Sequence, residues 1–315
     1  MPLHPRLAEF VSRMPPVAPD IFEDLPASRA RAHRPVGPAD PRIATTDRVI
    51  PGPDGDDLPI RIYRPVAATG ATGLAIWFHG GGWALGDIDS SDPDCRRLCA
   101  EQGPTVINVG YRLTPEHPYP AGFNDCYQAV VWAMENAADL EVDAGRIAVG
   151  GNSAGGALAA GVALRARDEH LTPSLRYLFL GYPALDYRAQ SRSIAQFPAK
   201  WMWGESPAAL WTVYLSRAGS PVPEYASPAL ATNLTGLPAT YLMVGEQDSF
   251  RDEALDFADR LLDAGVEVSL DLVPGMPHMF DIFGAELPVV RRAVDAWITA
   301  VGEHLTPVEV IDQPN

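Results

Sequence analysis

A glycine-rich turn, Gly-Gly-Asn-Ser-Ala-Gly-Gly, joins a strand pattern to a helical pattern near the middle of the chain. The apolar run at 147–149 precedes it, and small residues at helical spacing follow it. A sharp strand-to-helix turn can lift a serine Oγ clear of a sheet. It needs a positive φ at the serine and leaves no room for side chains two positions before and after it. Gly151 and Gly155 meet that demand around Ser153. The pattern predicts a nucleophile elbow, with a plain strand-to-helix turn as the alternative.

Strand and helix patterns alternate along most of the 315 residues. Such alternation predicts an α/β fold with a mostly parallel central sheet and helices on both faces. The first two strands flank a turn-rich linker at 51–55, which favours an antiparallel pair at the sheet edge. We expect strands over 43–50, 59–63, 74–78, 105–109, 147–149, 177–181, 240–244 and 266–272, and helices over 94–102, 122–137, 154–168, 252–264 and 287–304.

Two segments break this rhythm. Residues 1–45 are rich in proline and arginine with scattered apolar positions, and residues 185–225 are aromatic, polar and proline-bearing. We expect both to form helical pieces of a cap over the strand ends, with a disordered arm as the alternative for the first. The division is then an N-terminal cap part at 1–45, a catalytic domain at 46–305 that carries the insertion, and a tail at 306–315.

Composition excludes several classes of function. The net charge of −16 disfavours a nucleic-acid partner, because phosphates select basic surfaces. No apolar run approaches the roughly 18 residues that span a bilayer, and the first residues lack the apolar core of a secretion signal, so we expect a cytoplasmic protein. The three cysteines form no C-x-x-C pair, which favours buried thiols over a zinc site or a disulfide. We expect neither a metal nor a cofactor.

A nucleophilic serine needs a base, and chain order restricts the choice. In hydrolases with this turn the acid and then the histidine follow the serine, each in a loop after a strand. Only His278 and His304 lie late enough among the seven histidines. His304 ends a long amphipathic helix, whereas His278 lies in a tight loop, Pro-Gly-Met-Pro-His, after the last strand pattern. We therefore predict His278 as the base.

The acid must lie between the serine and the histidine. Asp248 follows the strand pattern at 240–244 and precedes His278 by one helix and one strand, so the two loops can emerge side by side. Glu246 is a rival, although it stands nearer the strand end and is better placed to brace the loop. Asp186 is a weaker alternative after the preceding strand. Asp248 is the predicted acid.

An oxyanion hole is predicted where the strand at 74–78 runs into His-Gly-Gly-Gly-Trp. Consecutive glycines let backbone N–H groups approach a substrate closely. Gly81 and Gly82 would supply two donors, and Ala154 a third from a helix N-terminus. A phosphate-binding loop is the rival, but the lysine and the spacing of the known phosphate motifs are missing. His79 more plausibly holds this loop through hydrogen bonds than acts as a base.

Several motifs occur together and in order, and as a set they resemble one family. They are HGGGW at His79, YRLTPEHPYPAG from Tyr111, GNSAGG from Gly151, SPAL from Ser227, EQDSFRDEA from Glu246, and the late His278. The chain resembles the hormone-sensitive lipase family of α/β-hydrolases, in its microbial carboxylesterase branch, over residues 45–304. The resemblance implies the α/β-hydrolase fold with a helical cap and the same triad and oxyanion donors.

The resemblance also implies an activity. We expect a serine carboxylesterase that hydrolyses small esters with short to medium acyl chains through an acyl-enzyme, without a cofactor. Asp252 matches a second aspartate that steadies the acid-bearing turn, and a homodimer through the sheet edge or the last helix is implied. Two positions depart from the family pattern. Asn152 stands where aspartate or threonine is common, and Met279 stands where glycine often follows the histidine.

The substrate pocket and the leaving group are less constrained. Aromatic residues of the oxyanion loop and the cap are candidates to wall an apolar pocket, with the cap's own core as the alternative for each: Trp83, Phe10, Phe22, Phe197, Trp201, Trp203, Trp211 and Tyr214. An amidase or a lactonase would use the same triad. A ligand receptor on the same scaffold is a further alternative, which the intact set of Ser153, Asp248 and His278 disfavours.

Overall fold

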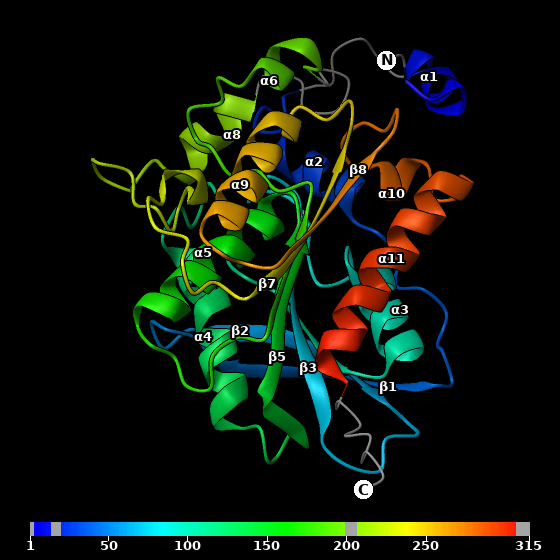
Figure 1. Cartoon of the computed structure of the whole chain (residues 1–315), viewed down its shortest axis with the longest axis vertical. Coiled ribbons are helices and arrows are strands. Elements are labelled where there is room, and N and C mark those ends of the chain that lie inside the picture. Colours follow the sequence, from blue (N-terminus) through cyan, green and yellow to red (C-terminus); the bar gives the residue numbers. More distant parts are fainter. Residues whose placement is uncertain (1–2, 14–19, 199–206, 307–315) are drawn as a thin grey trace, which may run out of the picture.

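A single sheet of eight strands forms the centre of the molecule, in the order β1-β2-β4-β3-β5-β6-β7-β8 (Figure 1). The computed structural model describes residues 3–13, 20–198 and 207–306. β2 pairs antiparallel with both β1 and β4, and the remaining pairs are parallel. The strands are β1 (Ile43–Pro51), β2 (Asp57–Pro65), β3 (Thr72–Phe78), β4 (Thr105–Val109), β5 (Val142–Asn152), β6 (Tyr177–Gly181), β7 (Ala239–Gly245) and β8 (Val268–Val273).

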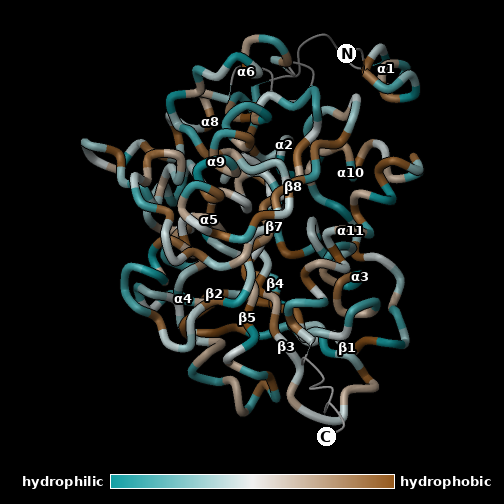
Figure 2. The backbone as a smooth tube through the Cα atoms, in the orientation of Figure 1, coloured by the Kyte–Doolittle hydropathy of each residue, from teal (hydrophilic) through white to brown (hydrophobic). Residues whose placement is uncertain are grey.

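The central strands are apolar because helices cover both of their faces. Every residue of β4 and β6 is buried. Figure 2 shows the apolar, brown stretches along the central strands. Strands of this kind need no alternation of polar and apolar residues, and their short continuous apolar runs are what the sequence shows.

Two layers of helices enclose the sheet. Figure 1 shows α3 (Asp92–Gln102) and α11 (Pro288–Leu305) on one side, and α4 (Ala121–Glu135), α5 (Ala154–Asp168) and α9 (Arg251–Asp263) on the other. Trp297 of α11 packs on Trp77 of β3 and Phe179 of β6, with ring centroids 5.3 and 4.5 Å away. These large side chains fix the last helix to the middle of the sheet.

Short helices lie beyond the carboxyl ends of the parallel strands, at the top of Figure 1. They are α1 (Pro5–Ser12) and α2 (Leu25–Ala32) from the N-terminal segment, and α6 (Arg192–Gln196) and α8 (Pro207–Tyr214) from the 185–225 segment. Two further short elements are η1 (Pro228–Leu230) and α10 (Phe280–Phe283). The division into cap and catalytic domain stays a prediction, and the predicted tail at 306–315 lies outside the described residues except for Thr306.

Candidate active site

The predicted elbow lies at the end of β5, where Ser153 separates the strand from α5. Ser153 has a φ of 57°, a left-handed conformation that few non-glycine residues adopt. A Cβ on either Gly151 or Gly155 would overlap the carbonyl oxygen of Phe78 at the end of β3. These two glycines therefore let the turn lie directly on the neighbouring strand.

A hydrogen-bonded chain links Ser153, His278 and Asp248. The Nε2 atom of His278 lies 3.0 Å from the Oγ of Ser153. Its Nδ1 lies 2.8 and 3.1 Å from the two carboxylate oxygens of Asp248. Ser153 is 4% exposed, and the other two side chains are fully buried. An acid on Nδ1 places the proton there and leaves Nε2 free to accept the serine proton.

The loops after β7 and β8 hold this chain in place. Glu246 accepts a hydrogen bond from the backbone N–H of Gly275 at 2.9 Å and so joins the acid-bearing loop to the histidine-bearing loop. Asp248 accepts a second bond from the N–H of Phe250 at 2.8 Å. The bracing position predicted for Glu246 agrees with this contact.

The rival residues lie elsewhere. The carboxylate of Asp186 pairs with Arg188 at 2.7 Å. The ring of His304 stacks on Tyr177, and its Nδ1 bonds to its own helix at Ala300. Neither contributes to the hydrogen-bonded chain at Ser153.

The loop after β3 places two glycines beside the serine. Gly81 and Gly82 have φ values of 121° and 60°, and neither backbone N–H has an acceptor within the described part of the chain. A Cβ on Gly80 would meet the carbonyl oxygen of Asn152 at 3.0 Å, so this loop packs against the elbow itself. Ala154 begins α5 at the same place.

His79 contacts this loop and fixes it to Tyr111. Its Nδ1 donates to the carbonyl of Gly80 at 2.8 Å, and its ring stacks on Tyr111 with centroids 4.2 Å apart. The hydroxyl of Tyr111 donates to the carbonyl of His79 at 2.7 Å. Burial lowers the pKa of His79 to about 4, so the imidazole is neutral near pH 7. The contacts are those expected of a residue that pins the loop.

The helix α6 contacts the acid-bearing loop directly. The hydroxyl of Ser193 donates to the carbonyl of Ser249 at 2.7 Å and accepts from the N–H of Asp252 at 3.1 Å. The carboxylate of Asp252 accepts from the N–H of Ser193 at 3.0 Å and from Arg251, which in turn donates to the carbonyl of Glu246. Asp252 thus reaches the turn of the acid through Arg251, and it also fastens α6 to that turn.

A cavity of about 310 Å³ opens beside the serine. Ser153 and Gly81 are part of its lining, and Ile21 and Leu210 line it from the two segments predicted to form the cap. Met279, with a φ of 56°, lines it next to the histidine. A nucleophile, two free backbone donors and an apolar space large enough for a small organic group therefore meet at one place.

Known proteins share this arrangement over most of the chain. A family model described as the alpha/beta hydrolase fold matches residues 75–282. LipN, a carboxylic ester hydrolase of Mycobacterium tuberculosis, is 41% identical over 305 residues, which cover 91% of this chain and 78% of LipN. An arylesterase of Saccharolobus solfataricus is 36% identical over 245 residues, with 77% and 79% of the two chains covered. A bacterial heroin esterase of known structure has a TM-score of 0.89 at 38% identity and covers 97% of this chain and 98% of its own.

The chain belongs to the hormone-sensitive lipase family of α/β-hydrolases. It is a carboxylic ester hydrolase of the microbial branch.

Among the described residues, none of the aromatic side chains that the sequence suggested lines the cavity of this hydrolase. Trp83 stacks on Tyr214 of α8 with ring centroids 4.4 Å apart, and it packs at a tilt against Trp211 with centroids 4.3 Å apart. All three side chains are buried as a core between the loop after β3 and α8. Phe22 packs against the hydrophobic core. Its neighbour Ile21 lines the cavity instead. Apolar character does not distinguish a cavity wall from a packed core. Phe197 lies under Arg251, 5.1 Å from its guanidinium carbon; the side chain of Phe10, and Trp201 and Trp203, lie outside the described residues.

Polar groups that the sequence did not single out also line the hydrolase cavity. Asp94 of α3, Arg34 and Tyr182 are part of its lining. The hydroxyl of Tyr182 bonds to the carboxylate of Asp281 at 2.8 Å, and the amide of Asn152 lies 3.4 Å from the same carboxylate. Asn152 therefore faces a carboxylate behind the serine, where a second carboxylate in its place would be repelled.

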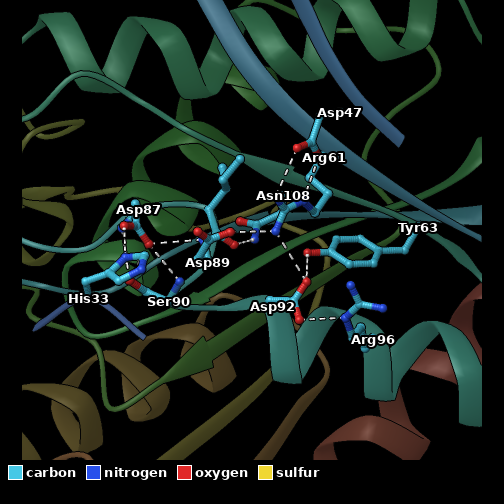
Figure 3. A network of polar contacts seen from close by, with 11 residues as sticks. His33, Asp47, Arg61, Tyr63, Asp87, Asp89, Ser90, Asp92, Arg96 and Asn108 are labelled. Atoms are coloured by element: carbon cyan, nitrogen blue, oxygen red, sulfur yellow. Dashed lines mark hydrogen bonds and ion pairs between the residues drawn. The ribbon is translucent and has the colours of Figure 1, made fainter. Parts of the chain in front are cut away.

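A network of charged side chains ties the N-terminal segment of the hydrolase to the sheet edge (Figure 3). His33 pairs with Asp87 at 2.9 Å, and Arg61 of β2 binds both Asp89 and Asp47. Within the described ranges, His33, Asp87 and Asp89 could together offer three atoms to a metal ion at the surface. Their oxygens already accept hydrogen bonds from Ser90 and Arg61, so we assign the cluster to the network.

Two further observations concern the whole hydrolase. Across residues 3–13, 20–198 and 207–306, no helix has both the length and the apolar character needed to cross a bilayer. Cys95, Cys99 and Cys126 are buried free thiols, and burial raises the pKa of each.

Proposed function

We propose that the hydrolase cleaves carboxylic esters by a two-step acyl transfer through Ser153. The observation that supports this most directly is the continuous hydrogen-bonded chain from Ser153 through His278 to Asp248. His278 takes the hydroxyl proton as Oγ attacks the ester carbonyl, and Asp248 keeps the imidazole in the right tautomer and stabilises its cation.

The backbone donors act on the charge that develops in this step. The N–H groups of Gly81, Gly82 and Ala154 would bind the oxyanion of the tetrahedral intermediate. Each such donor is worth about 3 kcal/mol of transition-state stabilisation where it has been removed in other enzymes. His278 then protonates the leaving alcohol, which breaks the C–O bond and leaves the acyl group on Ser153.

Water completes the cycle. It enters where the alcohol left, His278 removes its proton, and the second tetrahedral intermediate collapses to the free acid and the serine hydroxyl. Each proton is accounted for by the imidazole, so the chain's own groups and water suffice. The cavity of about 310 Å³ supports a preference for esters with short to medium acyl chains.

Replacement of the nucleophile tests the proposal. Ser153→Ala should lower kcat for p-nitrophenyl butyrate by about 10⁴-fold or more, as loss of a triad nucleophile does elsewhere. The matched control is Ser174→Ala, because Ser174 is exposed and outside the site. Comparable rates for Ser153→Ala and wild type would refute the proposed chemistry, and a chain-length series with its optimum on long-chain esters would refute the proposed size.

We also propose that the enzyme is a cytoplasmic homodimer that joins through β8 and has no nucleic-acid partner. The three reduced thiols support the location, and the charge of −16 supports the lack of affinity for nucleic acid. β8 is the last strand of the sheet, and Leu270 and Leu272 on it are exposed, which is unusual for an edge that faces water alone. Light scattering should give a dimer mass for wild type and a monomer mass for Leu270→Lys/Leu272→Lys.

A further inference from the structure

We propose that Asp94, supported by Asp281, makes part of the substrate cavity a subsite for a cationic nitrogen, so that the enzyme prefers esters that carry an ammonium group. This inference rests on the proposed ester hydrolysis at Ser153 and names the class of substrate for that same site. Its basis is the place of Asp94 in the cavity lining and the lack of a hydrogen-bond or ion-pair partner for its carboxyl group among the described residues.

Asp94 faces the cavity that Ser153 faces. Both residues are part of the lining, as are Asn152 and Tyr182. Within the described residues, the carboxylate of Asp94 has no hydrogen bond and no ion pair. Asp92, two positions earlier on the same helix, is fully buried and bonds to Tyr63, Arg96 and Arg61. The contrast separates a carboxylate that stabilises the fold from one that is directed at an open space.

Asp281 adds a second carboxyl group, which bonds to Tyr182 of the lining and whose charge acts on Asp94. It accepts from the hydroxyl of Tyr182 at 2.8 and 2.9 Å, and from the amide of Asn152 at 3.4 Å. No arginine or lysine of the described chain lies within ion-pair distance of it. Burial raises the pKa of both carboxyl groups, and the charge of Asp281 raises the pKa of Asp94 further. A cation in the cavity would offset the repulsion between these two carboxyl groups.

Other chemical groups fit the part of the cavity at Asp94 less well. An alkyl chain would bury Asp94 without any compensating hydrogen bond, which is unfavourable. An anion would be repelled by the two acids. Two arginines also line the cavity, but Arg31 is exposed and bonds to Ser28, and Arg34 forms no ion pair with either carboxylate. A cation gains from both carboxylates, and the net charge of −16 raises its local concentration.

Pairs of esters with the same shape test the inference. Choline butyrate and 3,3-dimethylbutyl butyrate differ only by nitrogen or carbon in the alcohol, and p-nitrophenyl 4-(trimethylammonio)butanoate and p-nitrophenyl 5,5-dimethylhexanoate differ in the same way in the acyl group. For at least one pair, kcat/KM should be about tenfold higher for the cation, the effect of one ion pair of roughly 1.4 kcal/mol. The pair that responds identifies the part of the ester that enters the cavity.

Single substitutions assign the preference to the acids. The ratio of cationic to neutral kcat/KM should fall towards one in Asp94→Asn and in Asp281→Asn. It should rise in Arg34→Gln, which removes an arginine of the lining whose charge acts on both acids. Asp259→Asn is the matched control, because Asp259 is exposed on α9 and the substitution makes the same change in charge. Its ratio should equal that of wild type.

The outcomes separate this inference from the proposed function. A ratio of one or less for both pairs in wild type, with the neutral esters hydrolysed, would overturn the cation subsite and leave the esterase intact. A wild-type preference that survives in both Asp94→Asn and Asp281→Asn would overturn the assignment to these acids. No hydrolysis of any ester by wild type would overturn the proposed function itself. The wild-type ratio needs no variant, so a variant that fails to fold leaves the inference testable.

Discussion

The turn at Ser153 depends on neighbours that have no side chain. Gly151 and Gly155 lie against the carbonyl oxygen of Phe78, and the serine between them is held at a positive φ. A chain that introduced a methyl group at either glycine would have to move the elbow away from β3. The position of the reacting hydroxyl is therefore set by backbone contact.

Gly155→Ala tests this contact. Its Cβ would overlap the carbonyl of Phe78 and lie 2.7 Å from that of His79, so we expect the free energy of unfolding to fall by about 3 kcal/mol and activity to be lost. Urea unfolding and p-nitrophenyl butyrate hydrolysis measure the two effects. Gly70→Ala is the control, since nothing lies within 4 Å of a Cβ there, and equal losses in the two variants would contradict the explanation.

His79 makes stability depend on pH. Its pKa is about 4 in the folded state, below the ordinary value of about 6.5 in the unfolded state. The unfolded chain therefore binds the proton first as pH falls, and stability is lost from about pH 6.5 downward, by about 2 kcal/mol at about pH 5.

Denaturant unfolding at about pH 7.5 and about pH 5 measures this effect. His79→Gln should lose about 2 kcal/mol less than wild type between the two values, although it is less stable at both. His117→Gln, which removes an exposed histidine, should keep the full wild-type loss. A wild-type loss that persists unchanged in His79→Gln would rule out this histidine as its source.

Sequence motifs predict the site residues that lie in recognisable loops after strands. They do not predict residues that reach the site only through the packing of elements distant in the chain. The chain order that selected Asp248 and His278 works because parallel strands end at one edge, and the structure places both within hydrogen-bond distance of their partners. Asp94 gave no signal, because an acid in the first turn of a helix is common. It comes to line the same cavity as Tyr182 and Met279 only when α3 and the segments after β6 and β8 are assembled in the fold.

At the scale of elements, buried strands were predicted best. The expected strands at 105–109 and 177–181 coincide with β4 and β6, because their runs are short and wholly apolar. β5 begins at Val142, five residues before the expected start. Its first half is polar and therefore lacks a strand pattern, and it becomes a strand by pairing with β3. The short helices α6 and α10 have too few residues for a periodic pattern, so the sequence does not predict them.

The contact of α6 with the acid-bearing loop carries a prediction of its own. Ser193→Ala would leave the carbonyl of Ser249 and the N–H of Asp252 without their partner, at a cost of about 1–3 kcal/mol. Because Asp248 lies in this loop, we expect kcat to fall several-fold with a smaller change in KM. Steady-state kinetics measure both, with Thr212→Ala as the control, whose hydroxyl bonds only within α8. A change in KM alone would contradict a positioning effect.

At the scale of the whole molecule, α2 of the N-terminal segment is joined to the loops beside the site by hydrogen bonds of Arg29. Arg29 of α2 donates to the carbonyls of Ala84 and Thr114 at 3.0 Å and pairs with Glu116. These contacts join the segment that carries Arg34 to the oxyanion loop. His33 adds the contact with Asp87 seen in Figure 3.

Arg29→Met should release this segment. We expect KM to rise several-fold with a smaller effect on kcat, because the cavity loses part of its wall while the triad lies on the sheet. Limited proteolysis should also cut the first forty or so residues faster than in wild type. Arg13→Met, which removes only an exposed pair with Glu9, is the control. Unchanged KM and unchanged proteolysis would show that other contacts hold the segment.

The close contact between the elbow and β3 has a consequence for how such an enzyme diversifies. The nucleophile and the oxyanion loop follow two adjacent strands that touch backbone to backbone, so their spacing is a property of the sheet and does not vary with the surrounding side chains. The walls of the cavity come from separate lengths of chain that cross above that sheet. Substrate range and reaction chemistry are thus encoded in different parts of the chain, and a cap transplanted from a relative should bring its selectivity with it while the host supplies the rate.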